Sequence, residues 1–198
     1  MPVRKHSSPL YACLTLVLLF SSTAAAKKNE SFPNINIKNF GQMDDRFYRG
    51  AQPRQEDYKS LADLGIKTVI DLRKDPESYE KPSVEGLGMR YVNIPMSDTE
   101  YPPSNQIEEF LKLVNDPSTG KFFVHCAGGR HRTGVMGAVY RFNHYHWNFD
   151  QVYAEMKDYD FYTRFGHGEM KRFVEDYSQK FTNAPAAQVI ANSGDNQK

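Results

Sequence analysis

A cysteine lies among positive charges and glycines in the stretch VHCAGGRHRTGVMG, residues 124–137. Glycines permit a tight backbone that a ligand can approach closely, and such a loop can point successive N–H groups inward to bind an anion. The helix that we expect from Thr133 adds its positive N-terminal end. Arg132 adds a planar guanidinium that can hold two phosphate oxygens at once. The stretch therefore predicts a cradle for a tetrahedral dianion.

The same features should act on the Cys126 thiol. Inward N–H groups, a helix N-terminus and cations all favour thiolate over thiol, so we expect a depressed pKa. A thiolate at the floor of the cradle could attack phosphorus in line and form a phosphocysteine, which divides one hard step into two easier ones. Thr133 is placed to donate a hydrogen bond to the sulfur, and we expect His125 to orient the loop through hydrogen bonds to backbone. This chemistry requires no metal and no organic cofactor.

These residues carry a family resemblance. The stretch matches H-C-x-x-G-x-x-R-[ST]-G, the signature of the cysteine-dependent protein tyrosine phosphatase superfamily, at His125, Cys126, Gly129, Arg132, Thr133 and Gly134. FYRGAQP (47–53) and VIDLR (69–73) resemble the compact dual-specificity branch, and the RHRTG ending is similar to the atypical dual-specificity phosphatases of plants and fungi, some of which cleave inositol pyrophosphates. The resemblance covers residues 35 to 180 and implies a catalytic role for the signature side chains. It also implies substrate binding by Ala127, Gly128, Gly129, Arg130, His131 and Arg132.

The resemblance further implies an acid that protonates the leaving oxygen, on a loop that follows a core strand. NIPMSDTEYPP (93–103) offers Asp98, with Glu100 as a rival on the same loop. Asp71 lies inside an apolar strand, so we expect a structural role for it. The W-P-D loop of the larger tyrosine-specific members is absent. The alternative for Asp98 is a surface carboxylate without a catalytic role, because an acid must come within hydrogen-bond reach of the leaving oxygen to act.

Other polar side chains admit two interpretations. Arg130 and His131 lie inside the loop but outside the fixed pattern, and they either recognise further phosphate groups or are solvated loop charges. His144 and His146 are two residues apart, a spacing that does not share a helix face, so no metal site is expected there. Trp147 is expected to pack in the core rather than to contact a ligand.

The pattern of apolar residues predicts an α/β fold. Strands alternate with amphipathic helices, which indicates a single domain with a largely parallel central sheet flanked by helices, and the resemblance implies the protein tyrosine phosphatase-like fold. The expected strands are 47–53, 67–72, 89–95 and 121–126. The expected helices are 53–65, 104–116, one from Thr133, 148–159 and one around 168–181, with loop or short helix over 76–88.

The N-terminus has the pattern of a secretory signal peptide. LYACLTLVLLF (10–20) is an apolar run, and SSTAAA ends in small residues with the A-x-A spacing before Lys27, which predicts cleavage after Ala26. An uncleaved membrane anchor is the alternative, but the run is shorter than the about 20 residues that span a bilayer core. A lipoprotein site at Cys13 is disfavoured because Cys13 lies within the run. We therefore expect export to a periplasm or outside the cell, without stable membrane insertion after cleavage.

The remaining chain divides into three expected parts: a polar N-terminal segment over 27–45, a dual-specificity phosphatase-like catalytic domain over 46–182, and a disordered tail over 183–198. The full chain has 25 basic and 24 acidic residues, a net charge of +1, so no nucleic-acid partner is expected. Cleavage would leave Cys126 as the only thiol. Such a protein cannot form an internal disulfide. A lone thiol in an oxidising compartment therefore invites a chemical explanation.

The leading hypothesis is a phosphatase that acts through a phosphocysteine on phosphotyrosine of proteins, with a shallow pocket that would also admit phosphoserine and phosphothreonine. The alternative is a phosphatase of inositol phosphates, inositol pyrophosphates or phosphoinositides, because the extra basic residues suit a multiply charged substrate. A third hypothesis, from another class, is an inactive phosphate-binding module. Such modules usually lose the cysteine, the arginine or the acid, and all three are present here. The sequence predicts no oligomeric state.

Overall fold

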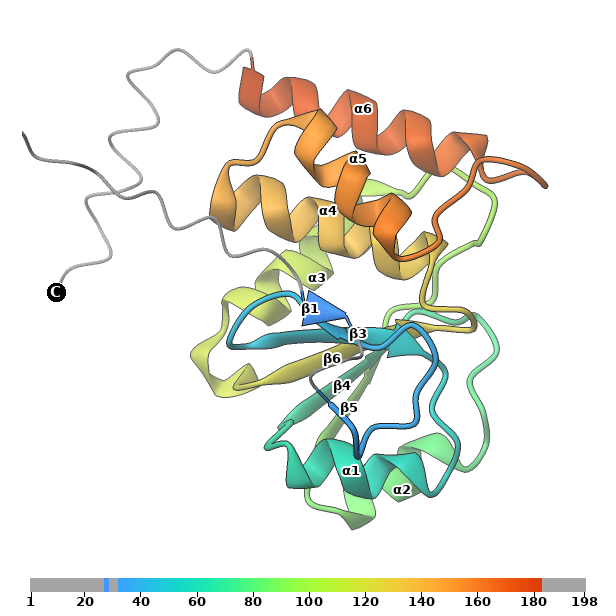
Figure 1. Cartoon of the computed structure of the whole chain (residues 1–198), viewed down its shortest axis with the longest axis vertical. Coiled ribbons are helices and arrows are strands. Elements are labelled where there is room, and N and C mark those ends of the chain that lie inside the picture. The colour runs from blue at the N-terminus through green and yellow to red at the C-terminus, as the bar shows by residue number, and fades with distance from the viewer. Residues whose placement is uncertain (1–26, 29–31, 183–198) are drawn as a thin grey trace, which may run out of the picture.

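The computed structural model describes residues 27–28 and 32–182 (Figure 1). The predicted signal peptide and the predicted C-terminal tail lie outside the described residues. Within the described part, a six-stranded sheet has the order β1-β2-β3-β6-β4-β5. Its strands are β1 (Lys27–Lys28), β2 (Gly41–Gln42), β3 (Phe47–Ala51), β4 (Thr68–Asp71), β5 (Arg90–Asn93) and β6 (Phe122–Cys126).

The sheet is mixed, with a parallel centre. β3, β6, β4 and β5 pair in parallel, whereas β1 and β2 add a short antiparallel edge next to β3. The prediction of a largely parallel sheet is therefore confirmed, and the two short antiparallel strands are additional to it. Loops that leave the carboxyl ends of the parallel strands meet at one edge of such a sheet, which is where ligand sites form in open α/β folds.

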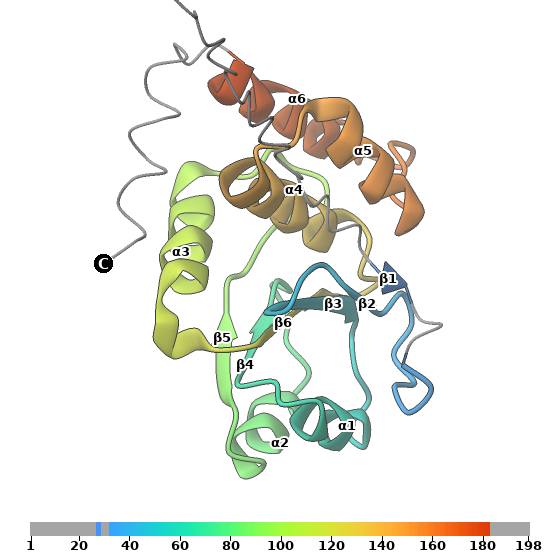
Figure 2. The ribbon, with the colours of Figure 1, turned by 60° about the vertical axis from the view of Figure 1, so that its left-hand side comes forward.

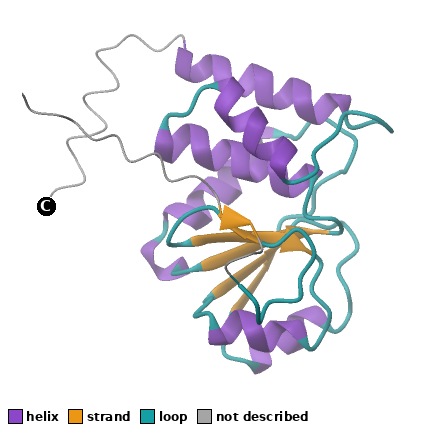
Figure 3. Cartoon of the chain, viewed as in Figure 1, coloured by secondary structure: helices purple, strands orange, loops and turns teal. Residues whose placement is uncertain are grey.

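Helices cover both faces of the sheet (Figures 2 and 3). The short helices α1 and α2 lie on one face, and α3 to α6 lie on the other (Figure 1). The helices are α1 (Asp57–Asp63), α2 (Glu80–Gly86), α3 (Ser104–Asn115), α4 (His131–Tyr145), α5 (Phe149–Asp158) and α6 (Gly168–Thr182), with the 3-10 turn η2 at Pro117–Thr119. Helix α4 begins two residues earlier than expected, so Arg132 and Thr133 lie in its first turn.

Side chains that alternate along the strands pack into two separate hydrophobic cores. Phe122 and Val124 of β6 pack in the cluster beneath α3 to α6, whereas Phe123 packs in the cluster beneath α1 and α2. Since both faces of β6 are covered, every residue of the strand is buried, which explains its continuous apolar run. Trp147 packs against the larger cluster, as expected.

The segment over 27–45, which we expect to be polar and irregular, also contributes apolar side chains to the core. Ile37, Phe40 and Met43 are almost completely buried, and the Phe40 ring stacks on Tyr48 and Phe123 with centroid distances of 6.1 and 5.9 Å. These apolar residues are three positions apart, but the segment forms no helix, so the spacing alone does not identify the sheet surface that buries them. No helix among the described residues is long and apolar enough to cross a membrane.

Candidate active site

Cys126 is the last residue of the buried strand β6. It pairs with Ala51 of β3 on one side, and the neighbouring His125 pairs with Asp71 of β4 on the other. The thiol is 3% exposed. The loop that follows leads directly into α4 at the carboxyl edge of the parallel strands (Figure 1). The central position of β6 therefore fixes the nucleophile at the floor of this edge.

The loop turns sharply at Gly129, where φ is +65°. A Cβ atom at this position would lie 2.4 Å from the Gly50 carbonyl carbon and 2.6 Å from the Ala51 nitrogen. Both contacts are with backbone, so neither can move aside easily. Glycine is required here both for its positive φ and for the close approach of the loop to β3.

Two side chains from elsewhere in the chain hold the loop by the Gly129 carbonyl. The Arg49 guanidinium donates to this oxygen at 2.8 Å, and the Asn39 amide donates to it at 3.0 Å. Arg49 is fully buried, and its guanidinium carbon lies over the Tyr159 ring, 3.9 Å from the centroid. Asn39 also donates to the Tyr159 carbonyl at 2.9 Å. The sequence analysis missed both residues. A charged residue within the otherwise apolar strand FYRGA was a signal that could have identified Arg49.

The surroundings of Cys126 lower the pKa of its thiol. Burial alone would raise this pKa, but the Arg132 charge, the Thr133 hydroxyl and the backbone N–H groups of Thr133 and Arg130 together outweigh burial. The Thr133 hydroxyl is buried, and no other partner competes for it among the described residues; its influence on the sulfur appears as one of the causes of the lowered pKa. The direction of the pKa agrees with the expectation, and Arg132 and Thr133 are among its causes.

His125 is oriented by carboxylates rather than by the expected hydrogen bonds to backbone. Its Nε2 lies 2.6 Å from Oε1 of Glu80, and its Nδ1 lies 3.9 Å from Oδ1 of Asp71. Burial opposes protonation of the ring, but Glu80 and then Asp71 outweigh it and raise the pKa of His125. The contact with Glu80 could not be expected from local sequence, because α2, which carries Glu80, lies far from His125 along the chain.

Asp71, Glu80 and His125 also form the one buried group of potential metal ligands found in the described part of the chain, with ligand atoms within 4.8 Å of one another. The 2.6 Å separation of the His125 and Glu80 atoms is a direct hydrogen-bond distance. Two ligands that share a metal at about 2 Å each lie farther apart than this. The cluster therefore has the geometry of buried ion-pair contacts beneath the loop, and Asp71 has the structural position expected of it.

A cavity of about 200 Å³ opens above the thiol. Its lining comes from the Cys126 loop, the loop that carries Asp98 and the segment between α5 and α6, namely Asp98, Cys126, Ala127, Gly128, Arg130, His131, Arg132, Tyr162 and His167. All but one of the predicted site residues that could touch a substrate are therefore brought together; Gly129 is turned toward β3, and Thr133 and His125 lie beneath the loop. Tyr162 and His167 were not predicted.

The two candidate acids differ in position. Asp98 lines the cavity, and its backbone carbonyl lies 2.6 Å from Nδ1 of His167. Glu100 is exposed and lies outside the lining, with its carboxylate 3.6 Å from Nζ of Lys74. Position therefore favours Asp98 over Glu100.

Arg130 and His131 differ in environment although they are adjacent. Arg130 is exposed at the rim, 3.9 Å from the Asp160 carboxylate. His131 is buried, and burial together with the neighbouring His167 lowers its pKa to about 4, so its ring is neutral at pH 7. Arg130 remains a candidate for contact with a further phosphate, whereas His131 is neither a solvated charge nor a cationic ligand.

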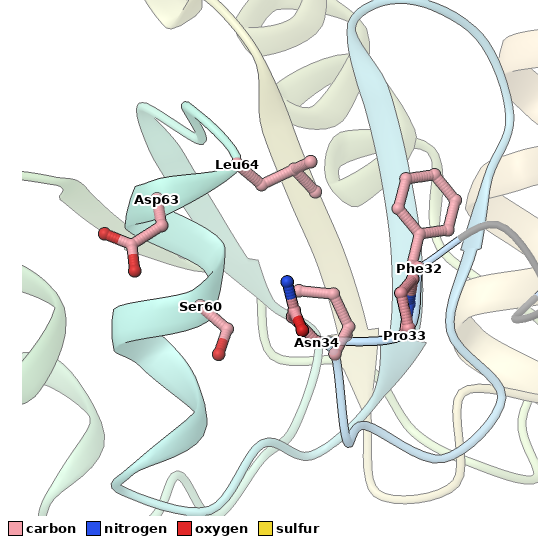
Figure 4. Close-up of a pocket in the computed structure, with 7 residues that line it drawn as sticks. Phe32, Pro33, Asn34, Ser60, Asp63 and Leu64 are labelled. Carbon is pink, nitrogen blue, oxygen red and sulfur yellow. The ribbon is translucent and has the colours of Figure 1, made fainter.

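Figure 4 shows another cavity, of about 260 Å³, between the segment Phe32–Ile35 and α1. Asn34, Ser60 and Asp63 contribute its polar side chains, and its lining contains no cysteine, histidine or arginine. It therefore lacks both an activated nucleophile and a cationic anion site. The cavity above Cys126 combines the two.

Comparison with known proteins relates the chain to phosphatases. The family model described as "DSP-PTPase phosphatase fused to NAD+ Kinase" matches residues 24–175. Among curated proteins, the probable tyrosine-protein phosphatase DG1060 of Dictyostelium discoideum is 30% identical over 150 residues, which cover 72% of this chain and 85% of the relative. The inositol diphosphatase SIW14 of Saccharomyces cerevisiae is 27% identical over 136 residues, which cover 64% of this chain and 47% of the relative.

The fold is shared with solved phosphatases. The core catalytic domain of the PP-IP phosphatase SIW14 from S. cerevisiae, solved in complex with citrate, aligns with a TM-score of 0.65 at 23% identity. The alignment covers 78% of this chain and 94% of that chain. The expected protein tyrosine phosphatase-like fold is therefore confirmed.

Proposed function

The chain belongs to the family of DSP-type phosphatases described as fused to NAD+ kinase, within the cysteine-dependent protein tyrosine phosphatase superfamily, and on this premise we propose that it hydrolyses phosphotyrosine in proteins. Phosphoserine and phosphothreonine are proposed as further substrates. The observation that carries the proposal is the position of a thiol of lowered pKa at the floor of a cavity that Arg132 and Asp98 also line.

In the proposed mechanism the phosphoryl group binds in the loop, with its oxygens held by Arg132 and the loop N–H groups. The Cys126 thiolate attacks phosphorus in line. The S–P bond forms as the bond from phosphorus to the leaving oxygen breaks, and Asp98 gives that oxygen its proton. The products of this step are the free alcohol or phenol and a phosphocysteine.

The second step releases the enzyme. The Asp98 carboxylate takes a proton from a water molecule that attacks phosphorus, the S–P bond breaks, and inorganic phosphate leaves. The electron pair of the S–P bond returns to Cys126, where Arg132 and the Thr133 hydroxyl stabilise the thiolate. The same contacts that lower the pKa of the free thiol thus make the sulfur a better leaving group.

The alternative substrate class is an inositol phosphate or pyrophosphate. It is supported by the relationship to SIW14, whose name describes an inositol diphosphatase, and by the exposed Arg130 at the rim. A second phosphate group on such a substrate would offer Arg130 a charge-assisted contact that a phosphotyrosine peptide does not supply.

Phosphate release by residues 27–198 under reducing conditions tests the proposal. The panel contains a phosphotyrosine peptide, a phosphothreonine peptide, an aryl phosphate, inositol hexakisphosphate and an inositol pyrophosphate. We expect activity that Cys126→Ser abolishes, with the highest kcat/KM for the phosphotyrosine peptide. The highest kcat/KM for the pyrophosphate, together with its loss in Arg130→Met, would select the alternative. Binding of phosphate without turnover of any member would support the inactive binding module.

We also propose that the protein is exported and processed after Ala26. The support is the apolar run followed by the A-x-A spacing. N-terminal sequencing of the protein isolated from its own cells would then begin at Lys27. Recovery of an uncleaved chain in the membrane fraction would favour the membrane anchor instead.

A further inference from the structure

Two histidine rings stack against each other in the wall of the cavity. His131, in the first turn of α4, and His167, immediately before α6, have ring centroids 3.5 Å apart and an interplanar angle of 13°. Each residue is 9% exposed. The edge of Tyr162 closes on His131 with a centroid distance of 4.4 Å. The stack thus joins the helix that carries Arg132 and Thr133 to the segment between α5 and α6.

Each ring also bonds to a backbone carbonyl of a different loop. Nδ1 of His167 lies 2.6 Å from the Asp98 carbonyl oxygen, and since a carbonyl can only accept, this nitrogen carries the hydrogen. His131 hydrogen-bonds to the backbone of Tyr162. A continuous path therefore leads from α4 through the two rings to the loop of Asp98.

The loop of Asp98 has few other attachments. Within the described residues, the remaining hydrogen bonds of residues 97–100 run from the backbone of Thr99 and Glu100 to the Ser97 hydroxyl, and an exposed ion pair joins Glu100 to Lys74. The segment of His167 also packs tightly on this loop, because a Cβ atom at Gly166 would lie 3.0 Å from Cγ2 of Thr99. On either side of residues 97–100, Met96 donates to the Leu72 carbonyl and Tyr101 donates to Asp176. His167 thus ties the four residues between these two attachments to the body of the domain at Asp98 itself.

We propose that His167 is a positioning residue: its Nδ1–H bond to the Asp98 carbonyl and its stack on His131 hold the Asp98 side chain in place to protonate the leaving oxygen. The inference rests on the role proposed for Asp98. General acids contribute about 10²–10⁴-fold to such reactions, so a modest displacement of the carboxylate has a large effect. His167 itself needs no contact with the substrate.

Three substitutions of His167 separate the effect of its hydrogen bond from the effect of its aromatic ring. His167→Phe keeps an aromatic ring for the stack but removes the donor. His167→Asn places its amide nitrogen where Nδ1 lies and keeps the donor, whereas His167→Gln moves the amide nitrogen away from that place. Full-length protein is used, and circular dichroism and the melting temperature are recorded for every variant.

The readout is the dependence of kcat/KM on the leaving group across a series of aryl phosphates. Substrates with basic phenols need the acid, and substrates with strongly acidic phenols do not. We expect His167→Phe and His167→Gln to lower kcat/KM about tenfold or more for phenyl phosphate but less than about threefold for the most acidic phenol, with His167→Asn close to wild type. If His167 has a mainly structural role, the variants would lower kcat/KM equally for both substrates, and this result would overturn the proposal.

Asp98→Asn is measured beside these variants to separate the two proposals. If Asp98→Asn steepens the leaving-group dependence and His167→Phe does not, the inference about His167 is wrong and the acid role of Asp98 stands. If Asp98→Asn leaves the dependence unchanged, the role proposed for Asp98 is wrong and the inference fails with it. Loss of activity in His167→Asn equal to that in His167→Phe would also overturn it, because the donor would not be the feature that matters.

Discussion

The Arg49 guanidinium donates to the Gly129 carbonyl at 2.8 Å. Arg49 belongs to β3, which pairs with the strand of Cys126. The bond therefore joins β3 to the outer side of the phosphate-binding loop. Because the carbonyl is directed toward Arg49 and Asn39, the N–H groups of the loop are free to face the cavity. The loop conformation is therefore held from outside by two residues that never reach the substrate.

Replacement of Arg49 tests this support. Arg49→Met removes the donor and the contact with Tyr159, and we expect kcat/KM to fall about 10–100-fold, because the loop atoms that bind phosphate shift. Arg46→Met is the matched control, since Arg46 donates to the Gly120 carbonyl at 3.2 Å and has no contact with the loop. Steady-state kinetics and melting curves for both variants check the prediction. Equal activity of Arg49→Met and wild type would show that Asn39 alone holds the loop.

Gly129 and Gly128 provide a matched pair of glycine substitutions. In Gly129→Ala the new Cβ would lie 2.4 Å from backbone at Gly50, and φ is positive, so we expect a loss of unfolding free energy of at least about 2 kcal/mol and loss of most activity. In Gly128→Ala the new Cβ meets only the flexible Arg130 side chain at 3.7 Å. Its stability should change by less than about 0.5 kcal/mol. Denaturant unfolding distinguishes them, and similar losses in both variants would contradict the argument.

The strand, loop and helix around Cys126 could be predicted because they are contiguous in sequence. The run KFFVHC, the glycines and the signature residues together specify a buried strand, a phosphate loop and a helix N-terminus, and the structure has these elements. The lowered pKa of Cys126 followed from the same local features. What the sequence did not supply are the contacts made across the fold.

Asn39 and Glu80 illustrate the limit of prediction from local sequence. Asn39 reaches Gly129 across 90 positions of the chain, and no period or spacing marks such a pair. His131 shows the same limit for charge: its sequence neighbours suggested a loop cation, but the rings of Tyr162 and His167 pack on it and keep it neutral. Local pattern predicts elements, whereas the partners of buried polar groups depend on how the elements pack.

The pair of His125 and Glu80 should make stability depend on pH. Protonated His125 is favoured in the folded state because its pKa is raised, so its contribution is complete below the ordinary imidazole pKa of about 6.5 and is lost as pH rises through the folded pKa. Although burial opposes ionisation of Glu80, His125 lowers the pKa of this carboxyl. Its contribution is therefore present above about pH 4.3 and is lost as pH falls through the folded pKa.

Glu80→Gln tests this dependence. The difference in unfolding free energy between wild type and Glu80→Gln should be largest between about pH 4.3 and 6.5 and should shrink at alkaline pH. Urea unfolding at a series of pH values measures it. Glu85→Gln is the control, because Glu85 is exposed and pairs with Lys81 at 3.9 Å. A difference that grows steadily with pH would contradict protonation of His125 in the folded state.

The thiol itself can be titrated by its rate of alkylation with iodoacetamide, with Cys126→Ser as the background. Half-maximal reactivity should fall below the ordinary thiol pKa of about 8.5, because Arg132 and Thr133 outweigh the effect of burial. Arg132→Met and Thr133→Val should each move the midpoint upward, since each removes a group that stabilises the thiolate.

Arg130→Met separates the side chain from the backbone in the same titration. Arg130 stabilises the thiolate through its backbone N–H, and its side chain is exposed and lies near Asp160. We therefore expect its midpoint to stay at the wild-type value while that of Arg132→Met rises. If the two arginine variants shift the midpoint equally, the thiolate responds to the total positive charge of the loop and not to the specific contact with Arg132.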